Sequence, residues 1–589
     1  YPPPYPPLLG GVVNNTSWAK FWLATLGVYE WEGLNPLPPE MWLLPYLLIV
    51  HPGRFWCHCR MVYLPMSYLF GRRATCRETP LIRSLRCELY SPATPYESVD
   101  WRRERNHCGA ADLYVSHHPL QNVLWTVLYH VEALVPQWLR QVSYLSFSTC
   151  QTPFSPSITR FFFSMSRARA LRWCMEMIHH EDLSTRYVDI GPVNKPLNML
   201  CCWYEDPEGE PFKAHLPRLF DYLWLAEDGM KCQGYNGSQL WDTAFAAQAV
   251  VATGMGEEFA PLLTKMHGYL ETSQVREDPP DPERFYRHIS NGAWPFSSQD
   301  HGWPISDCSS EGLKATLAIE MLGLDGVTKL DAGRLYDCVH VILSYQNKPE
   351  HWGDYGWATY ENSRGPGALE LLNPSECFGD IVIDYSYPEL TSACITALAR
   401  FQTVHPTHRA DEIHAAISSG ATWIRNAQRN DGSWYGSWGV CFTYAAWYAV
   451  VGLASVGERL NEGTHVSKAI HFLFAQQRDD GGWGESYLSS STKQYHQASK
   501  ADGSQVVNTS WAMLAILAGT EGDAEDEARV RPALERAAEC LLSLQLPNGD
   551  WPQQLISGVF NHNCMITYAN YRHIFPIWAL GEYRKRYLL

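Results

Sequence analysis

The sequence predicts an all-α protein built from stacked helices, as an open solenoid or a closed α/α barrel. Three segments share the pattern Q-x-x-x-G-x-W, and each follows a run with apolar residues at helical spacing. A helix–turn unit of this kind buries its apolar face only against neighbouring copies, so recurring units stack. The length of 589 residues is enough for two domains with a large core.

The three repeats follow the helical runs GATWIRNA, KAIHFLFA and RAAECLLSL. The repeated glycine fits a helix C-terminus or a tight turn. We expect each tryptophan to stack on the glutamine before it and to pack against the next helix. A degenerate fourth copy, QNKPEHW, has Glu350 in place of the glycine and ends at Trp352. The three full copies are QRNDGSW at 428–434, QRDDGGW at 477–483 and QLPNGDW at 545–551.

The N-terminal half is also expected to be helical, in segments such as PLIRSLRCELY and PLNMLCCWYEDP. The stretch PEGEP at 207–211 is a plausible linker, which divides the chain into domains 1–215 and 216–589. Between 141 and 175 there is no Asp, Glu or Lys, and SYLSFSTCQTPFSPSITRFFFSMS shows no helical period. We interpret about 141–170 as an atypical insertion, either on the surface or foreign to the mature chain. The first residue is not Met, so we expect the true N-terminus to be missing.

Composition excludes several classes of function. The net charge of -16 argues against nucleic-acid binding, which needs clustered Lys and Arg. No run of about 20 apolar residues is present, so no membrane-spanning helix is predicted. The 17 cysteines lack disulfide or zinc spacing, and Cys57, His58 and Cys59 lie too close together to surround one ion. We therefore expect reduced, mostly buried cysteines in a cytosol-facing protein, with no metal and no cofactor.

The segment GWPISDCSSEG, which opens at Gly302, places Asp307 beside Cys308 in apolar surroundings. Two interpretations are open. Asp is a preferred N-cap, so from the local sequence alone Asp307 caps the helix that follows. Alternatively, Asp307 is a proton donor in a dry pocket, because a carboxyl group among apolar groups keeps its proton more readily than one in water.

Several long motifs resemble the oxidosqualene cyclase family of triterpene cyclases. The Q-x-x-x-G-x-W repeats are a hallmark of that family, and GWPISDCSSEG resembles its Asp-Cys-Thr-Ala-Glu motif, with Ser309 and Ser310 for Thr and Ala. The segments FWCHCRMVYLPMSYLFG, DYLWLAEDGMKCQGYNGSQLWDTAFA and NCMITYANYRHIFPIWALGEYR are similar to family segments in the same order. The resemblance implies two α/α barrels, the N-terminal one incomplete, with the active cavity between them. It also implies a monotopic protein of the endoplasmic reticulum membrane or of lipid droplets, in contact with the membrane surface.

The substrate implied by the resemblance is 2,3-oxidosqualene. Asp307 would be the general acid that opens the epoxide, and Cys308 its hydrogen-bonding partner. The family supplies a second thiol just before Thr-Ser, where this chain has Leu390 in DYSYPELTSACI. Cys394 lies one helical turn further on. It either substitutes for that thiol or is an ordinary buried cysteine, and the second interpretation is favoured.

Aromatic faces are expected to stabilise the cation that forms after ring opening, since no metal takes part and water would quench it. Each ring is worth roughly 0.5 to 2 kcal/mol to a nearby cation. For any single aromatic residue, an ordinary core position is the simpler interpretation. By motif match with the family, the lining would include Trp56, Trp241, Phe296, Trp438, Phe560 and Tyr568.

Three positions, His58, Tyr235 and Ile305, resemble the branch of the family that makes cycloartenol in plants and algae. His58, Tyr235 and Tyr360 would form the polar patch that accepts the final proton, because a neutral imidazole can take one. Ile305 would act by its bulk and hold the cation over that patch. The alternative products are lanosterol, parkeol or another triterpene, and the chain could also be an inactive, truncated copy. Metal-dependent terpene synthases fit poorly, because no D-D-x-x-D magnesium motif is found.

Overall fold

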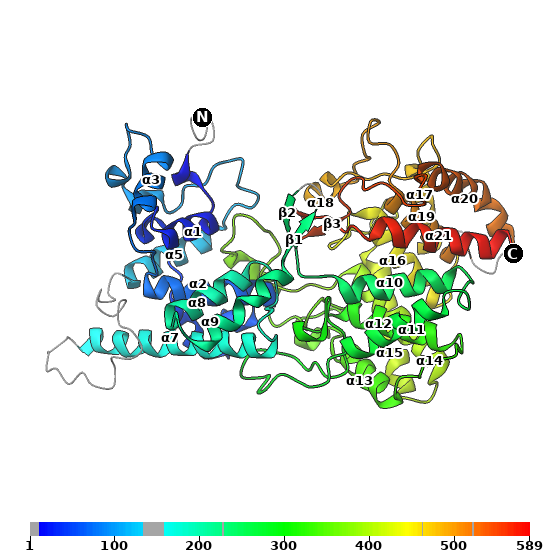
Figure 1. The fold of residues 1–589 in the computed structure, drawn as a ribbon, viewed down its shortest axis with the longest axis horizontal. Helices are drawn as coiled ribbons and strands as arrows, with labels where there is room; N and C mark the ends of the chain where they lie inside the picture. The colour runs from blue at the N-terminus through cyan, green and yellow to red at the C-terminus, as the bar shows by residue number, and fades with distance from the viewer. Residues whose placement is uncertain (1–10, 133–157, 227–228, 462, 521–523) are drawn as a thin grey trace. The chain divides into compact units, whose positions relative to one another are not determined.

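The computed structural model describes residues 11–132, 158–226, 229–461, 463–520 and 524–589 (Figure 1). Contacts divide the chain into two compact units, each described here by itself. The first unit holds Tyr1–Asp221 and Arg364–Ile383, and the second holds Tyr222–Ser363 and Asp384–Leu589. The division therefore falls after Asp221 rather than after residue 215. The sequence did not foresee that Arg364–Ile383 packs with the first unit.

The described part of the second unit contains six helices that pack side by side in a closed ring. Each contacts the next along the chain, and the last returns to the first. The inner helix with the sequence FTYAAWYAVVGLAS is buried almost all round, which explains why it is apolar on every face. The ring confirms the all-α prediction and selects the closed barrel over the open solenoid. The inner helices are α10 (Gln239–Ala252), α12 (Ser306–Glu320), α14 (Pro388–Val404), α16 (Phe442–Ser455), α19 (Val506–Gly519) and α21 (Tyr571–Tyr587).

A second layer of helices alternates with the inner ones and covers the outside of the ring. Its members bury one face only, as α15 does with Ile413, Ala416 and Ile424. Two antiparallel hairpins complete the unit: β1 (Leu223–Ala226) with β2 (Gly229–Cys232), and β3 (Gly558–Phe560) with β4 (Cys564–Ile566). The outer helices are α11 (Ala260–Ser273), α13 (Ala332–Ser344), α15 (Ala410–Ala427), α17 (His465–Gln476) and α20 (Ala524–Leu544), and the short α18 spans Leu488–Thr492.

The repeats are clamps between successive outer helices. In the first copy, Gln428 Nε2 donates to Gly432 O (2.9 Å) in its own turn and to His465 O (2.9 Å) at the start of α17. Trp434 Nε1 donates to Ile424 O (2.8 Å) in the last turn of α15. The glutamine thus bonds backbone carbonyl groups, and the expected stacking of Trp on Gln stays a prediction. In the second copy, Gln477 donates to Gly481 O and Ala533 O, and Trp483 donates to Leu473 O. In the third copy, Gln545 donates to Gly549 O and Trp551 donates to Leu541 O.

The degenerate copy uses a tryptophan other than the one its spacing suggests. Trp352 is 52 % exposed, so it is not the buried tryptophan of the clamp. Trp357 is fully buried and donates to Ile342 O (2.7 Å), four residues before Gln346, as in the full copies. Gln346 Nε2 in turn donates to Tyr355 O and to Ala416 O on α15. The assignment of Trp352 was therefore wrong, because the longer turn carries the indole past position 352.

A further clamp was not visible in the sequence. Gln274 Nε2 donates to Gly292 O (2.6 Å) and to Arg334 O (3.1 Å) on α13. Trp294 Nε1 donates to Leu270 O (2.8 Å) in α11. A long intervening loop separates the glutamine from the tryptophan, which hides the pattern from a search at fixed spacing.

The first unit is also helical. Its central helix α2 packs against α7 and α8 and is buried along nearly all of its length. The segments from Tyr1 to Gly10 and from 133 to 157 lie outside the described residues, and so does most of the expected insertion. The helices are α1 (Ser17–Leu26), α2 (Cys57–Arg72), α3 (Pro80–Leu89), α4 (Trp101–Glu104), α5 (Pro119–Glu132), α7 (Ile158–Ser184), α8 (Asn194–Glu205) and α9 (Glu210–His215).

The helix α7 corrects one expectation. Residues 158–166 were interpreted as part of a stretch without helical period, but they form the first turns of α7. The C-terminal part of this helix buries Cys174, Met175 and Ile178 in the first unit, and this tertiary packing outweighs the weak local pattern. In the described parts of the chain, no helix is both long enough and apolar enough to span a membrane.

Candidate active site

Asp307 lies in the first turn of α12 and is only 7 % exposed. The N-cap of this helix is Ile305, and no side chain makes a cap bond there, so the N-cap interpretation of Asp307 is wrong. Instead, Asp307 Oδ1 accepts the backbone N–H of Cys308 at 2.7 Å. The carboxyl group is thus buried and held beside Cys308.

Burial raises the pKa of Asp307 from 3.8 to about 7, because the charged form loses its water. The N–H and thiol of Cys308 act in the opposite direction, while the nearby carboxyl groups of Glu311 and Glu389 raise the pKa further. A substantial fraction of Asp307 therefore carries its proton near neutral pH. This is the property that a general acid needs.

The thiol of Cys394 does not bond the acid directly. Its Sγ accepts from Ser310 Oγ (3.4 Å) and lies 3.7 Å from Ser306 O, so both of its partners are neighbours of Asp307 on α12. Leu390, one turn earlier on α14, is fully buried. Cys394 therefore ties α14 to α12, which agrees with its interpretation as a structural cysteine.

A small cavity of about 30 Å³ lies at the N-terminal ends of the inner helices, next to Asp307. This is room for about one or two waters, well below the roughly 300–1,000 Å³ of typical ligand pockets. Nine of the residues predicted from sequence line it: Tyr235, Trp241, Phe296, Ile305, Asp307, Cys308, Tyr360, Trp438 and Tyr568.

The lining rings contact one another edge to face. Tyr235 lies 5.2 Å from Phe296 and 6.1 Å from Trp438 between ring centroids. Phe296 in turn lies 6.2 Å from Tyr568, again at a steep angle. Such contacts fix the orientation of each ring, and they join four of the lining residues into one aromatic cluster.

Sequence reasoning missed three lining residues: Thr359, Tyr444 and Tyr571. The hydroxyl of Tyr571 accepts from Trp241 Nε1 (2.6 Å), and Thr359 Oγ1 accepts from Trp438 Nε1 (3.2 Å). Both bonds orient indoles that were predicted. Position in the sequence could have identified two of the missed residues. Tyr444 and Tyr571 lie in the first turns of the inner helices α16 and α21, as Asp307 lies in the first turn of α12.

Three predicted residues are not among those that line this cavity. Phe560 contacts the lining residue Trp438, with ring centroids 5.6 Å apart. Trp56 and His58 belong to the first unit, where their rings meet edge to face at 4.9 Å at the start of α2. Their place relative to Asp307 stays a prediction.

Buried carboxyl groups hold the backbone of the lining segments. Asp384 Oδ2 accepts the N–H groups of Thr359 and Tyr360, both at 3.1 Å. Glu485 accepts three successive N–H groups at the start of α16, from 441 to 443, and so fixes the turn that carries Tyr444. Burial raises the pKa of both carboxyl groups. Both of these lining segments are therefore held by buried carboxyl groups.

The first unit contains a separate, larger cavity of about 630 Å³. Its wall is almost entirely apolar and includes Phe55, Tyr63 and Leu124. Its few polar lining groups include an ion pair between Arg167 and Glu132 (2.7 Å). The volume lies in the range of roughly 300–1,000 Å³ typical of ligand pockets.

Two family descriptions match this chain: Squalene-hopene cyclase N-terminal domain over residues 8–192 and Squalene-hopene cyclase C-terminal domain over residues 237–585. A cycloartenol synthase of Dictyostelium discoideum is 47% identical over 98% of this chain and 76% of its own length. The lanosterol synthase of Homo sapiens is 44% identical over 98% of this chain and 74% of its own length. Among solved structures, ent-copalyl diphosphate synthase from Streptomyces platensis matches 96% of this chain and 98% of its own, with a TM-score of 0.43 and 15% identity. The chain belongs to the squalene-hopene and oxidosqualene cyclase family.

Proposed function

We propose that this protein cyclises 2,3-oxidosqualene, with Asp307 as the acid that opens the epoxide. One observation carries the proposal: a carboxyl group with a pKa of about 7 faces a cavity walled by aromatic rings. An epoxide oxygen gains a proton as its C–O bond breaks, and the carbon left behind becomes cationic. Acid and aromatic rings are the two components that this step requires.

The residues around the acid suit the charges that develop. After transfer, the Asp307 carboxylate keeps the N–H of Cys308 as a donor at 2.7 Å, which stabilises the new negative charge. Burial raises the pKa of Tyr568 and Tyr444, which also line the cavity, so both rings stay neutral and can stabilise a nearby cation.

For the product we propose cycloartenol. Tyr235 and Tyr360 line the same cavity with ring centroids 6.4 Å apart, and Ile305 lies in the same wall. In this proposal the two hydroxyl groups and the imidazole of His58 accept and relay the last proton, while Ile305 limits how the cation can shift. Lanosterol and parkeol are the alternatives, because loss of a different proton from the same cation gives a different triterpene.

Expression in yeast that lacks its own lanosterol synthase tests both parts of the proposal. Extraction of the sterols and mass spectrometry should detect cycloartenol with the unchanged chain and no cyclised product with Asp307→Asn. Lanosterol or parkeol in place of cycloartenol would overturn the product assignment and leave the acid in place. A stably expressed, folded chain that makes no triterpene would instead establish the inactive copy.

We further propose that the first unit contacts the endoplasmic reticulum membrane from one side. Apolar side chains of the segment 44–50 are exposed, with Leu47 at 88 %, and so are Leu120, Val123 and Val127 on α5. Five of these exposed residues also line the large apolar cavity: Leu44, Val50, Leu120, Val123 and Val127. An apolar substrate dissolved in lipid would therefore meet a continuous apolar surface leading into that cavity.

Flotation with liposomes tests the membrane proposal. The double variant Leu47→Lys, Val123→Lys should lose most of its binding to neutral phosphatidylcholine vesicles, because charged side chains resist transfer to lipid. Leu225→Lys, at a residue that is 77 % exposed on β1 of the second unit, is the matched control and should float like the unchanged chain. Equal flotation of the double variant and the control would contradict the proposal.

A further inference from the structure

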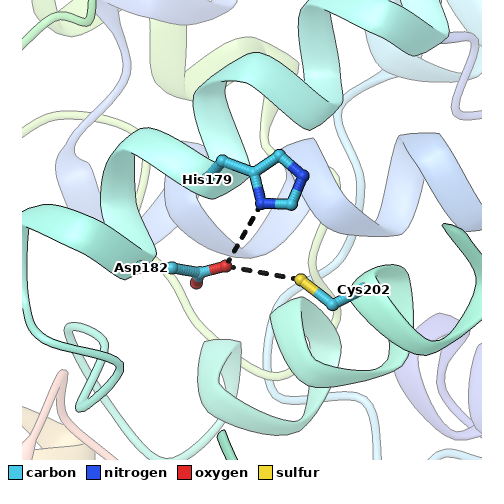
Figure 2. A group of neighbouring side chains, drawn as sticks. All are labelled: His179, Asp182 and Cys202. Carbon is cyan, nitrogen blue, oxygen red and sulfur yellow. Dashed lines mark hydrogen bonds and ion pairs between the residues drawn. The ribbon is translucent and has the colours of Figure 1, made fainter. Parts of the chain in front are cut away.

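A cluster of possible metal ligands lies in the first unit, between α7 and α8 (Figure 2). His179 and Asp182 are three residues apart on α7 and so share one face of the helix. Asp182 Oδ2 lies 4.0 Å from His179 Nδ1 and 3.4 Å from the Sγ of Cys202 on α8. The three ligand atoms all lie within 4.8 Å of one another. Around a tetrahedral ion, ligand atoms about 2.0–2.3 Å from the metal have separations close to these.

Neighbouring side chains hold two of these groups by their other atoms. Glu205 Oε2 lies 2.7 Å from His179 Nε2 at the far side of the imidazole, which directs Nδ1 toward Asp182. Asn198 Nδ2 donates to Asp182 Oδ1 (3.1 Å), so Oδ2 is the oxygen turned to the cluster. A carboxylate on the outer nitrogen of a histidine, and a hydrogen bond on the outer oxygen of a carboxylate, are the supports that metal ligands have in proteins.

A second set of ligand atoms, which shares Asp182, is already occupied by a cation of the chain. Asp189 and His215 lie near Asp182, but Lys195 Nζ is 2.7 Å from His215 Nδ1 and 3.7 Å from Asp189 Oδ2. Because Nδ1 of His215 accepts from the ammonium group, its Nε2 carries the proton, and this atom lies 3.3 Å from Asp182 Oδ2. The lysine therefore neutralises that side of the cluster, and the His179 side is the one left for an ion.

We propose that His179, Asp182 and Cys202 bind a zinc ion, with the fourth position open. One thiolate, one imidazole nitrogen and one carboxylate oxygen suit Zn²⁺, whereas Mg²⁺ and Ca²⁺ take oxygen ligands only. Binding replaces the bond from the Cys202 thiol to Asp182 and releases the thiol proton. Asp182 and Cys202 are buried, and His179 is 30 % exposed, so the ion reaches the site past the imidazole. The ion would join the C-terminal parts of α7 and α8 within the first unit.

The full chain, freed of metal with a chelator, tests the proposal by titration with Zn²⁺. We expect one saturable zinc per chain and a higher melting temperature with zinc. Cys202→Ser and His179→Gln should lower the zinc affinity at least about tenfold. Their neighbours provide matched controls: Cys201→Ser, whose thiol lies 3.6 Å from Pro65 O, and His180→Gln should bind zinc like the unchanged chain.

Cobalt gives a second readout that does not depend on the stability of any variant. Co²⁺ bound by the unchanged chain should show the near-ultraviolet absorption of a cobalt–thiolate bond, and Cys201→Ser should keep this band. No saturable zinc binding by the unchanged chain, or cobalt binding without the thiolate band, would overturn the proposal. Equal zinc affinity of Cys202→Ser and Cys201→Ser would overturn it as well.

Discussion

The carboxylate of Glu389 on α14 accepts the backbone N–H groups of Trp438 (3.0 Å) and Ser437 (2.6 Å) through one oxygen. Glu389 is fully buried, and burial raises its pKa. The bond fixes the segment that presents the Trp438 ring to the cavity, so Glu389 positions part of the aromatic wall. It also lies close enough to Asp307 to raise the pKa of the proposed acid.

We expect Glu389→Ala to lower turnover and to change the product mixture. The substitution leaves two partly buried N–H groups without their acceptor, at a cost of up to about 1–3 kcal/mol each, and it removes one restraint on Trp438. Glu389→Gln keeps an acceptor oxygen and should restore most of the activity. Product analysis and melting temperatures of both variants make the comparison, and equal behaviour of Gln and Ala at this position would contradict the positioning role.

Asp307→Asn should reduce turnover of 2,3-oxidosqualene by about 10²–10⁴-fold or more, because the amide cannot deliver the proton. The fold should persist, since an amide of the same shape fills the same buried space. Asp331→Asn is a matched control, because Asp331 is exposed at the N-terminus of α13, accepts from Gly333 N–H (2.9 Å), and Asn caps helices equally well. Full activity of Asp307→Asn in a direct assay would remove the acid assignment.

The pH profile of turnover should follow the protonated form of Asp307. With a pKa of about 7, activity should be level below that pH and should fall about tenfold per pH unit well above it. Turnover of detergent-dispersed substrate from pH 5 to pH 9 gives the profile. An activity that rises through pH 7 would show that the ionised form is the active one.

The raised pKa of Asp307 also predicts how the free energy of unfolding depends on pH. The folded-state pKa of about 7 lies above the ordinary 3.8, so the folded chain holds this proton more tightly than the unfolded chain. The stabilisation is complete at low pH and is lost as the pH rises through the folded-state value. Denaturant titrations should therefore show that Asp307→Asn gains stability relative to the unchanged chain between pH 5 and pH 8, and a constant difference would contradict this.

The two tryptophans of the degenerate repeat should differ strongly. Trp357→Ala removes a fully buried indole and its bond to Ile342 O, and it should lower the free energy of unfolding by about 3–5 kcal/mol. Trp352→Ala, at a side chain that is 52 % exposed, should change it by no more than about 0.5 kcal/mol. Thermal unfolding of the two variants decides the matter, and a larger effect at position 352 would restore the assignment made from spacing.

The glutamines of the repeats offer a graded comparison. Gln428 Nε2 donates to Gly432 O and to His465 O on the next outer helix, while Gln545 Nε2 donates, within the described residues, to Gly549 O alone. At about 0.5–1.5 kcal/mol per bond, Gln428→Ala should destabilise the barrel more than Gln545→Ala. Melting temperatures measured side by side test the order, and the reverse order would show that the bond between outer helices contributes little.

The sequence alone determined what depends on neighbouring residues. Apolar spacing indicated the helices, and the glycine of each repeat indicated where an outer helix ends. These features depend on interactions within one or two helical turns, so they leave a readable pattern. For Asp307 the local sequence favoured a helix cap, and only the family motif favoured an acid. The family motifs then led to most of the residues that line the cavity.

The tertiary structure decided what depends on contacts between distant segments. Closure of the ring brings the N-termini of α10, α12, α16 and α21 to one cavity, which adds Tyr444 and Tyr571 to its wall. Packing also selects Trp357 over Trp352 and pairs Gln274 with Trp294 across a long loop. The sequence carries no fixed spacing for such contacts, because the loops vary in length while the helices that they join must still meet.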